Sequence, residues 1–274
     1  MASIPGLPHS APGPCGRLRA MRTVAIMANK GGVGKTSITL GLAGAAAVKG
    51  LAVLVIDLDP QGNATSHLRT RTTKVTVVDV LENPTSDTLI EAITVCDWDA
   101  GIGEVDVVPS SPDAIRFDAW RGTGTTTRLA RALKGIEGYD LVLIDCPPSL
   151  GALTREALTA AEVAVIVTSP SYFGLQGVER SVAEIDEVRA MSNPALTLAG
   201  VIVNRVRSVS EEHAFRSREL GNLVDRVKIL KPFLPDRMAM QQSEGAGVPV
   251  QLVKGGGAKE VSEILDKYLR KILK

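Results

Sequence analysis

The sequence predicts an α/β protein with a doubly wound, mostly parallel sheet flanked by helices. Short aliphatic runs of strand length alternate with longer helical segments from residue 23 to residue 203. Such alternation predicts parallel strands joined by crossover helices. Aromatic residues make up only 3% of the chain and hydrophobic residues 45%. The core is therefore expected to be aliphatic, as is typical of parallel sheets covered by helices.

The chain of 274 residues is expected to form a single domain over residues 21–274, preceded by a flexible tail, residues 1–20. The tail contains four prolines and lacks the apolar stretch of a signal peptide. Met21 lies directly before the first predicted strand and could serve as an alternative start. The net charge of +1 gives no global signal for nucleic-acid binding, so any DNA contact must come from a local patch.

A glycine-rich loop, residues 29–37, follows the first predicted strand, residues 23–28, and precedes a helical segment, residues 38–48. In this context the glycines allow successive backbone N–H groups to point inward, and with the helix N-terminus they form a cradle for phosphate. A lysine in the loop can reach the β- and γ-phosphates, and the next hydroxyl can bind Mg²⁺. The nucleotide-binding residues expected here are Lys30, Gly31, Gly32, Val33, Gly34, Lys35, Thr36 and Ser37.

The loop departs from the strict phosphate-loop pattern, because Asn29 stands where that pattern has its first glycine. Instead, a second lysine, Lys30, stands at the loop entrance. This variant resembles the deviant phosphate loop of the ParA/MinD family of ATPases. In that family the entrance lysine reaches across a dimer to the partner's nucleotide, so the resemblance implies a catalytic role for Lys30. A chance glycine-rich turn is the alternative, and two further motifs at suitable distances argue against it.

The second predicted strand, residues 51–56, runs into the sequence Asp-Leu-Asp-Pro-Gln-Gly-Asn, residues 57–63. Carboxylates at the carboxyl end of a parallel strand lie where α/β sheets bind ligands. The segment resembles the family's switch I, which implies that Asp59 positions or polarises the attacking water and contributes to the metal site. Asp57 is expected to support the loop and the metal shell. For either residue, a cap or loop role is the alternative.

The next segments carry no chemistry that the sequence reveals. Short amphipathic pieces are predicted over residues 77–81 and 89–93, separated by a proline, and a strand over residues 105–109. A helix entry follows at residues 110–112, and a helix is predicted over residues 125–133.

The third motif is a strand of four aliphatic residues, residues 141–144, that ends in Asp145 and is followed by Cys-Pro-Pro. A carboxylate in this position can hold Mg²⁺ directly or through water. The Pro-Pro turn resembles the family's switch II. Cys146 is interpreted as a packing residue, because no histidine accompanies it in a motif. The residues expected at the metal are Thr36, Asp59 and Asp145.

Two further buried strands are predicted over residues 163–167 and 198–203, joined by a helix over residues 175–189. Asn204 follows the second of them, at the position where family members recognise adenine. A loop asparagine without that role is the alternative. By the same resemblance, Pro235 and Asp236 after the late strand are expected to contact the nucleotide.

Residues 205–237 hold a local basic excess, with eight Arg or Lys against five acidic residues. Charge alone favours a solvated helix face, but the resemblance implies non-specific DNA contacts in this region. The match is imperfect, because family members often show Pro-Arg-x-x-Arg where this chain has Pro-Asp-Arg-Met-Ala. The expected DNA-binding residues are Arg205, Arg207, Arg218 and Arg237.

Apolar residues at helical spacing predict a final helix over residues 261–272, ending in basic residues. Such a helix could lie on a membrane, as in MinD, but a helix packed on the sheet is favoured. No apolar run is long enough to span a bilayer. Three scattered cysteines indicate a reducing cytosol and no disulfide framework or zinc site. They also argue against a resemblance to the nitrogenase iron protein.

The resemblance covers about residues 22–273 and implies a ParA-type partition ATPase without a helix-turn-helix domain. ATP and Mg²⁺ would cement a sandwich homodimer that binds double-stranded DNA non-specifically, and hydrolysis stimulated by a ParB-like partner would release it. Basal turnover should be slow, and the protein cytoplasmic and nucleoid-associated, with no membrane contact. The N-terminal tail could contact the ParB-like partner. Two alternatives remain: a MinD-like membrane switch, and a metabolic enzyme of the same fold that phosphorylates a small molecule.

Overall fold

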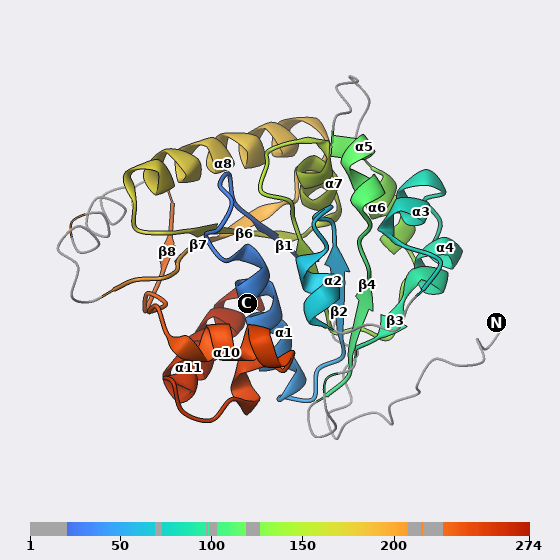
Figure 1. Ribbon diagram of the computed structural model, residues 1–274. Helices are drawn as coiled ribbons and strands as arrows, with labels where there is room; N and C mark the ends of the chain where they lie inside the picture. Colours follow the sequence, from blue (N-terminus) through green and yellow to red (C-terminus); the bar gives the residue numbers. More distant parts are fainter. Residues whose placement is uncertain are drawn as a thin grey trace.

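Strands in the order β3-β4-β2-β5-β1-β6-β7-β8 form one sheet, which helices cover on both faces (Figure 1). All neighbouring strands pair in parallel except β3, which runs antiparallel to β4. The computed structural model describes residues 21–68, 73–96, 98, 103–118, 127–207, 215 and 227–274. The strands are β1 (Arg22–Met27), β2 (Val53–Asp57), β3 (Thr94–Val95), β4 (Val105–Val108), β5 (Leu141–Asp145), β6 (Val163–Thr168), β7 (Thr197–Val203) and β8 (Ile229–Leu230).

The helices confirm the predicted alternation with the strands. Residues 1–20, including the expected flexible tail, lie outside the described residues, as do residues 125 and 126 at the start of one predicted helix. The helices are α1 (Lys35–Ala47), α2 (Asn63–His67), α3 (Val77–Glu82), α4 (Ser86–Ala92), the 3₁₀ turn η1 (Pro112–Ala114), α5 (Ile115–Asp118), α6 (Arg128–Leu133), α7 (Ala152–Ala160), α8 (Tyr172–Met191), α10 (Met238–Ala246), the 3₁₀ turn η3 (Val250–Leu252) and α11 (Ala258–Ile272).

The doubly wound arrangement follows from strands that are buried on both faces. In β1, Val24 and Ile26 join the apolar cluster under α1 and α11, whereas Ala25 and Met27 join the cluster under α7 and α8. Successive side chains of a strand point to opposite faces, so every strand except the edge strand β3 contributes to both clusters. Each buried Val, Ile or Leu stabilises the fold by about 1.5–3 kcal/mol relative to an exposed one. The predicted α/β class with a mostly parallel sheet is confirmed.

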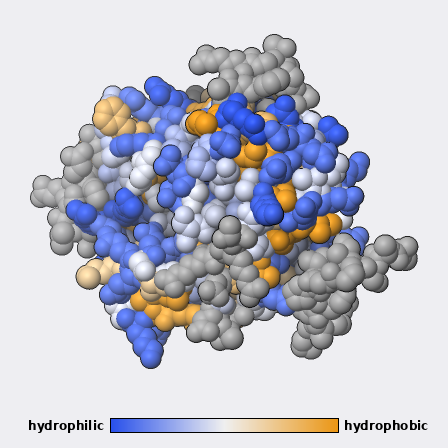
Figure 2. Space-filling model, turned by 45° about the vertical axis from the view of Figure 1, so that its right-hand side comes forward, coloured by the Kyte–Doolittle hydropathy of each residue, from blue (hydrophilic) through white to orange (hydrophobic). Residues whose placement is uncertain are grey.

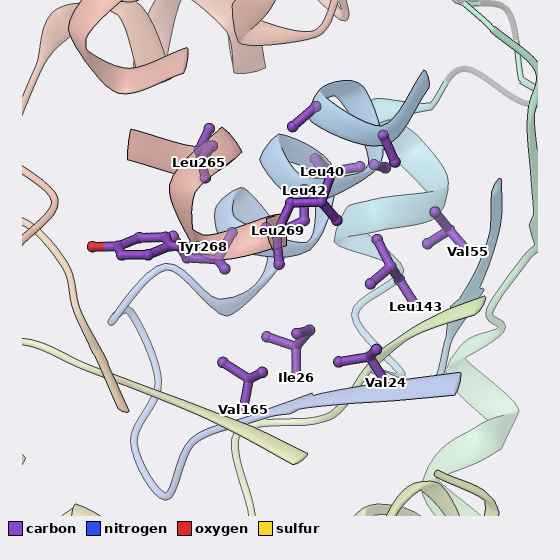
Figure 3. Packing of buried hydrophobic residues seen from close by; sticks show 14 of the residues in the cluster. Val24, Ile26, Leu40, Leu42, Val55, Leu143, Val165, Leu265, Tyr268 and Leu269 are labelled. Carbon is purple, nitrogen blue, oxygen red and sulfur yellow. The ribbon is translucent and has the colours of Figure 1, made fainter. Parts of the chain in front are cut away.

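The final helix, α11, packs its apolar face against α1, and this confirms the packed arrangement favoured from the sequence. Leu265, Tyr268 and Leu269 lie between α11 and the side chains of α1 and β1 (Figure 3). Tyr268 is fully buried. Since the apolar face of α11 is buried in the core, that face is not available for insertion into a lipid surface. Within the described ranges no helix is long and apolar enough to cross a bilayer.

The surface shown in Figure 2 is mainly hydrophilic. Hydrophobic residues appear on it as separate small areas and not as one continuous patch. Isolated apolar residues of this kind are normal on monomeric proteins.

The close packing of α1 on α11 gives a first testable prediction. A Cβ atom at Gly41 in α1 would lie 2.7 Å from Cδ1 of Leu265. Gly41→Val should therefore lower the free energy of unfolding by about 1–3 kcal/mol, as overpacked core sites do. Urea titration measures this difference. Gly245→Val is the matched control, because a Cβ there meets nothing within 4 Å. Equal stability of the two variants would contradict the packing described here.

Candidate functional site

A cavity of about 380 Å³ opens at the carboxyl ends of the central strands. Ligands of open α/β sheets bind at this edge, where the strand order reverses. The glycine-rich loop between β1 and α1 forms one wall, and Asp59, after β2, forms another. The lining residues from the loop are Gly31, Gly32, Gly34, Lys35, Thr36 and Ser37.

The loop owes its shape to glycine. Gly32 and Gly34 have φ angles of 76° and 91°, in the left-handed region that side chains rarely adopt. A Cβ on Gly34 would also lie 2.3 Å from the Asn204 amide nitrogen. Gly34 is the N-cap of α1 and provides no side-chain hydrogen bond, so the first N–H groups of the helix are left for an anion.

The structure separates the two lysines of the loop. Lys35 is 6% exposed and lines the cavity. Lys30 is exposed, is not among the residues that line the cavity, and has its Nζ 5.7 Å from the ring centroid of Phe173 in α8. The sequence predicted nucleotide contacts for both lysines, and within one chain only Lys35 is placed to make them.

The predicted metal site brings together Thr36 and Asp145. The Thr36 hydroxyl donates to Oδ2 of Asp145 at 2.7 Å, and the Thr39 hydroxyl donates to Oδ1 at 3.0 Å. Burial raises the pKa of the Asp145 carboxyl. Asp145 is fully buried behind Thr36, so its main effect on a metal is to orient the Thr36 oxygen.

These oxygens suit Mg²⁺, which uses one or two carboxylates together with substrate phosphates and water. Asp59 provides a further carboxylate in the same cavity. Among the described residues no group of three or more His, Cys, Asp or Glu side chains is arranged to hold a metal. A dedicated all-protein metal cage is thus absent from the described part of the chain, and the donors fit a metal that arrives with a nucleotide.

The two aspartates after β2 have different surroundings. Asp57 is buried and accepts hydrogen bonds from the backbone N–H groups of Asp59 and Thr65, at 3.1 and 2.8 Å, and from the Thr65 hydroxyl at 2.7 Å. Burial, and then repulsion from Asp145, raise the pKa of Asp57. Asp59 accepts the N–H of Gln61 at 3.0 Å and lines the cavity. Asp57 therefore shapes the loop, and Asp59 is placed at the cavity.

Asn204 and Arg205 bind the loop itself. The Asn204 amide donates to the Val33 carbonyl at 2.8 Å, and its oxygen accepts the N–H of Arg205 at 2.8 Å. Arg205, with a φ of 57°, donates to the Gly32 carbonyl at 2.6 Å and lines the cavity. Both polar groups of Asn204 are thus engaged within the protein, and Arg205 lies at the cavity and not on a separate basic surface.

The other late positions expected to bind nucleotide or DNA do not line the cavity where the structure describes them. Neither Pro235 nor Asp236 is among the described residues that line it. Asp236 instead pairs with Arg207 at 2.8 Å. Arg237 pairs with Glu260 of α11 at 2.7 Å, and Arg218 lies outside the described residues.

Several cavity residues were not predicted from the sequence. The carboxylate of Glu244, in α10, accepts a hydrogen bond from the Ser37 hydroxyl and lines the cavity. Its position more than 200 residues after the loop left no local signal. Gln61, Asn63 and His67, which follow Asp59, also line the cavity. Their only signal was their place directly after the switch-like segment.

Comparisons with known proteins agree with this geometry. Residues 21–198 match the family described as AAA domain. The chain is 41% identical over 187 residues to the chromosome-partitioning ATPase Soj of Thermus thermophilus, covering 68% of this chain and 70% of that protein. It is 33% identical to the chromosome partitioning protein ParA of Caulobacter vibrioides, and the match covers 85% of this chain and 87% of that protein.

A solved structure shares the fold. Cobyrinic acid a,c-diamide synthase from Mycobacterium smegmatis, with bound ADP and magnesium, has a TM-score of 0.74 and 27% identity, covering 90% of this chain and 93% of that one.

Proposed function

Because the chain belongs to the ParA/Soj family of partition ATPases, we propose that it is a DNA-segregation switch whose ATP-bound dimer binds DNA. It is an ATPase, with ATP as substrate and Mg²⁺ as metal cofactor. The observation that carries the proposal is the different placement of two lysine side chains of one loop. Lys35 lies inside the cavity, and Lys30 lies outside it with an exposed side chain.

Within one chain, the residues around the cavity bind and orient the substrate. The N–H groups at the start of α1 and the Lys35 ammonium bind the phosphates. Thr36, held by Asp145, and the Asp59 carboxylate line the cavity, and in this proposal they would hold the metal and the attacking water. Mg²⁺, when bound, neutralises charge on the phosphate oxygens. Asp59 orients the water for attack.

A second copy completes the site in this proposal. A cation on an exposed aromatic face gains only about 0.5–1 kcal/mol, so the contact with Phe173 does not hold Lys30 strongly. An ammonium 4 Å from a phosphate gains about 4 kcal/mol at an effective dielectric of 20, before desolvation is subtracted. The phosphate of a partner's nucleotide therefore outcompetes Phe173, and each Lys30 bridges to the other subunit.

The dimer then acts as the DNA-bound state. Two copies double the number of phosphate contacts, which raises DNA affinity steeply. Loss of the γ-phosphate removes the anchor of Lys30 and releases the dimer. Slow basal hydrolysis keeps the bound state until a ParB-like centromere-binding protein stimulates it. The expected location is the cytoplasm, on the nucleoid.

The direct test measures the oligomeric state of the protein, by size-exclusion chromatography, and its DNA binding. Both are measured with ATP, with ADP and without nucleotide. Dimerisation and DNA binding only with ATP support the proposal. Phosphorylation of a small molecule without dimerisation would instead favour a metabolic enzyme of the same fold. ATP-dependent binding to anionic vesicles but not to DNA would favour a membrane switch.

Glu244 gives a prediction within the cavity. Its carboxylate lies beside Ser37, at the start of the phosphate-binding helix. The negative charge of this carboxylate is expected to repel the phosphates of a bound nucleotide. Glu244→Gln should tighten ATP binding by roughly threefold to tenfold, as measured by titration calorimetry. Glu263→Gln, on the exposed side of α11, is the control and should leave the affinity unchanged. Weaker binding by Glu244→Gln would contradict repulsion and indicate a direct bond to the nucleotide.

A further inference from the structure

Four lysines near the end of the chain form a basic surface that the sequence analysis did not assign to DNA. The C-terminal lysine cluster, as defined here, consists of Lys231, after β8, and of Lys267, Lys271 and Lys274. The last three have spacings of four and three residues along α11 and its end, so they share one side of that helix. The Lys271 ammonium donates to the Lys231 carbonyl at 2.7 Å, which joins the two segments. β8 and α11 both lie toward the β8 edge of the sheet (Figure 1).

Among the described residues, the cluster lacks carboxylate partners like those that pair with two of the arginines expected to bind DNA. In the described part of the chain, no carboxylate lies within 4.0 Å of any of its four ammonium groups. Arg207 and Arg237, in contrast, are paired with Asp236 and Glu260. Residues 267–274 contain four cationic side chains and no acidic side chain. Residues 227–234 contain two cationic side chains and no acidic side chain.

Two of the four ammonium groups also contact uncharged groups of the protein. The Lys231 ammonium lies 3.5 Å from the ring centroid of Phe233, and partial burial lowers its pKa. Lys267 and Lys274 are exposed. The cluster therefore projects a concentrated positive field that an external polyanion would neutralise.

The chemistry of the cluster indicates which polyanion fits. A lipid surface would need an apolar face next to the charges, and that face of α11 is buried on α1. Single-stranded nucleic acid would need exposed aromatic rings for stacking, but Tyr268 is fully buried and Phe233 is half-buried beneath Lys231. Ammonium groups are point charges without the planar fork that reads base edges. What remains is sequence-independent contact with phosphates.

We propose that the C-terminal lysine cluster is the surface through which this protein contacts the phosphate backbone of double-stranded DNA. The inference rests on the proposed function, in which the ATP-bound dimer is the DNA-binding form. It replaces the paired Arg207 and Arg237 as the main contact residues. Each dimer carries two copies of the cluster, so the contacts double on dimerisation.

The test compares two double variants of the full chain that lose the same charge. Lys267→Gln with Lys274→Gln removes two exposed lysines of the cluster and leaves the contact between Lys271 and Lys231 in place. Lys74→Gln with Lys134→Gln removes two exposed lysines elsewhere on the surface. DNA affinity is measured with ATP, by anisotropy of a short fluorescent duplex of mixed sequence at several salt concentrations. Sizing with ATP verifies that each variant still dimerises.

The cluster variant should bind the duplex at least about tenfold more weakly than wild type, independently of sequence. Four lost contacts per dimer should make the plot of log affinity against log salt shallower by about three to four units. The control variant should bind like wild type. Unchanged binding by the cluster variant, or equal weakening of both variants, would overturn the proposal while leaving the proposed function intact. Wild-type protein that dimerises with ATP but binds only anionic vesicles, through these lysines, would overturn both.

Discussion

Lys35→Ala is expected to abolish ATP binding. Lys35 is 6% exposed and lies in the cavity at the first turn of α1, where its charge faces the phosphates. Truncating one partner of such a desolvated charge pair costs about 2–5 kcal/mol or more, which corresponds to a roughly thirtyfold to several-thousandfold loss of affinity. Titration calorimetry with ATP and Mg²⁺ measures this directly.

Lys30→Ala is the matched control, because it removes the same charge from the same loop. Lys30 does not line the cavity, so the variant should bind ATP like wild type but fail to dimerise. The comparison separates the roles of the two lysines. ATP affinity of Lys35→Ala within a few-fold of wild type would refute the assignment of the loop.

Asp59→Asn is expected to stop hydrolysis while ATP binding persists. The amide is nearly isosteric and its oxygen can still accept the N–H of Gln61, so the loop should keep its shape. The lost carboxylate can no longer orient or deprotonate water, which lowers turnover by about 10²–10⁴-fold. Phosphate release measures turnover, and sizing with ATP should show a dimer that accumulates and persists.

Asp57→Asn serves as the companion variant. Asp57 accepts three hydrogen bonds within the protein, so its replacement should reduce thermal stability as well as activity. Asp59→Asn should leave the melting temperature almost unchanged. Normal turnover by Asp59→Asn, or a monomer in the presence of ATP, would contradict its catalytic role.

Local patterns in the sequence were sufficient for the six longer strands and for the loop, whereas the two-residue strands β3 and β8 were not predicted. Aliphatic runs such as residues 141–144 are buried on both faces, so composition and length alone indicate strands. The glycines of the loop follow from backbone geometry, since Gly32 and Gly34 adopt left-handed conformations. These features depend on neighbours in the chain, which is why the sequence reveals them.

Features that depend on distant partners could not be predicted. The sequence analysis did not assign the α7 helix, and one contact at its start involves a distant residue, because the Asp118 carboxylate accepts the N–H of Leu153 at 3.4 Å. The same applies to Glu244 in the cavity. The family resemblance implied that Arg207 and Arg237 contact DNA, but it could not show that both side chains are paired, with Asp236 and Glu260.

The packing of α11 on α1 also determines when α1 can be covered during synthesis of the chain. The apolar side of α1, complete at residue 47, is covered by a helix that is not complete until residue 272. At about 5–20 residues per second, translation of the intervening chain takes roughly ten to forty-five seconds. During that interval α1 lacks the helix that covers its apolar side, so the nascent chain should acquire nucleotide affinity only after α11 has been made and has emerged from the ribosome.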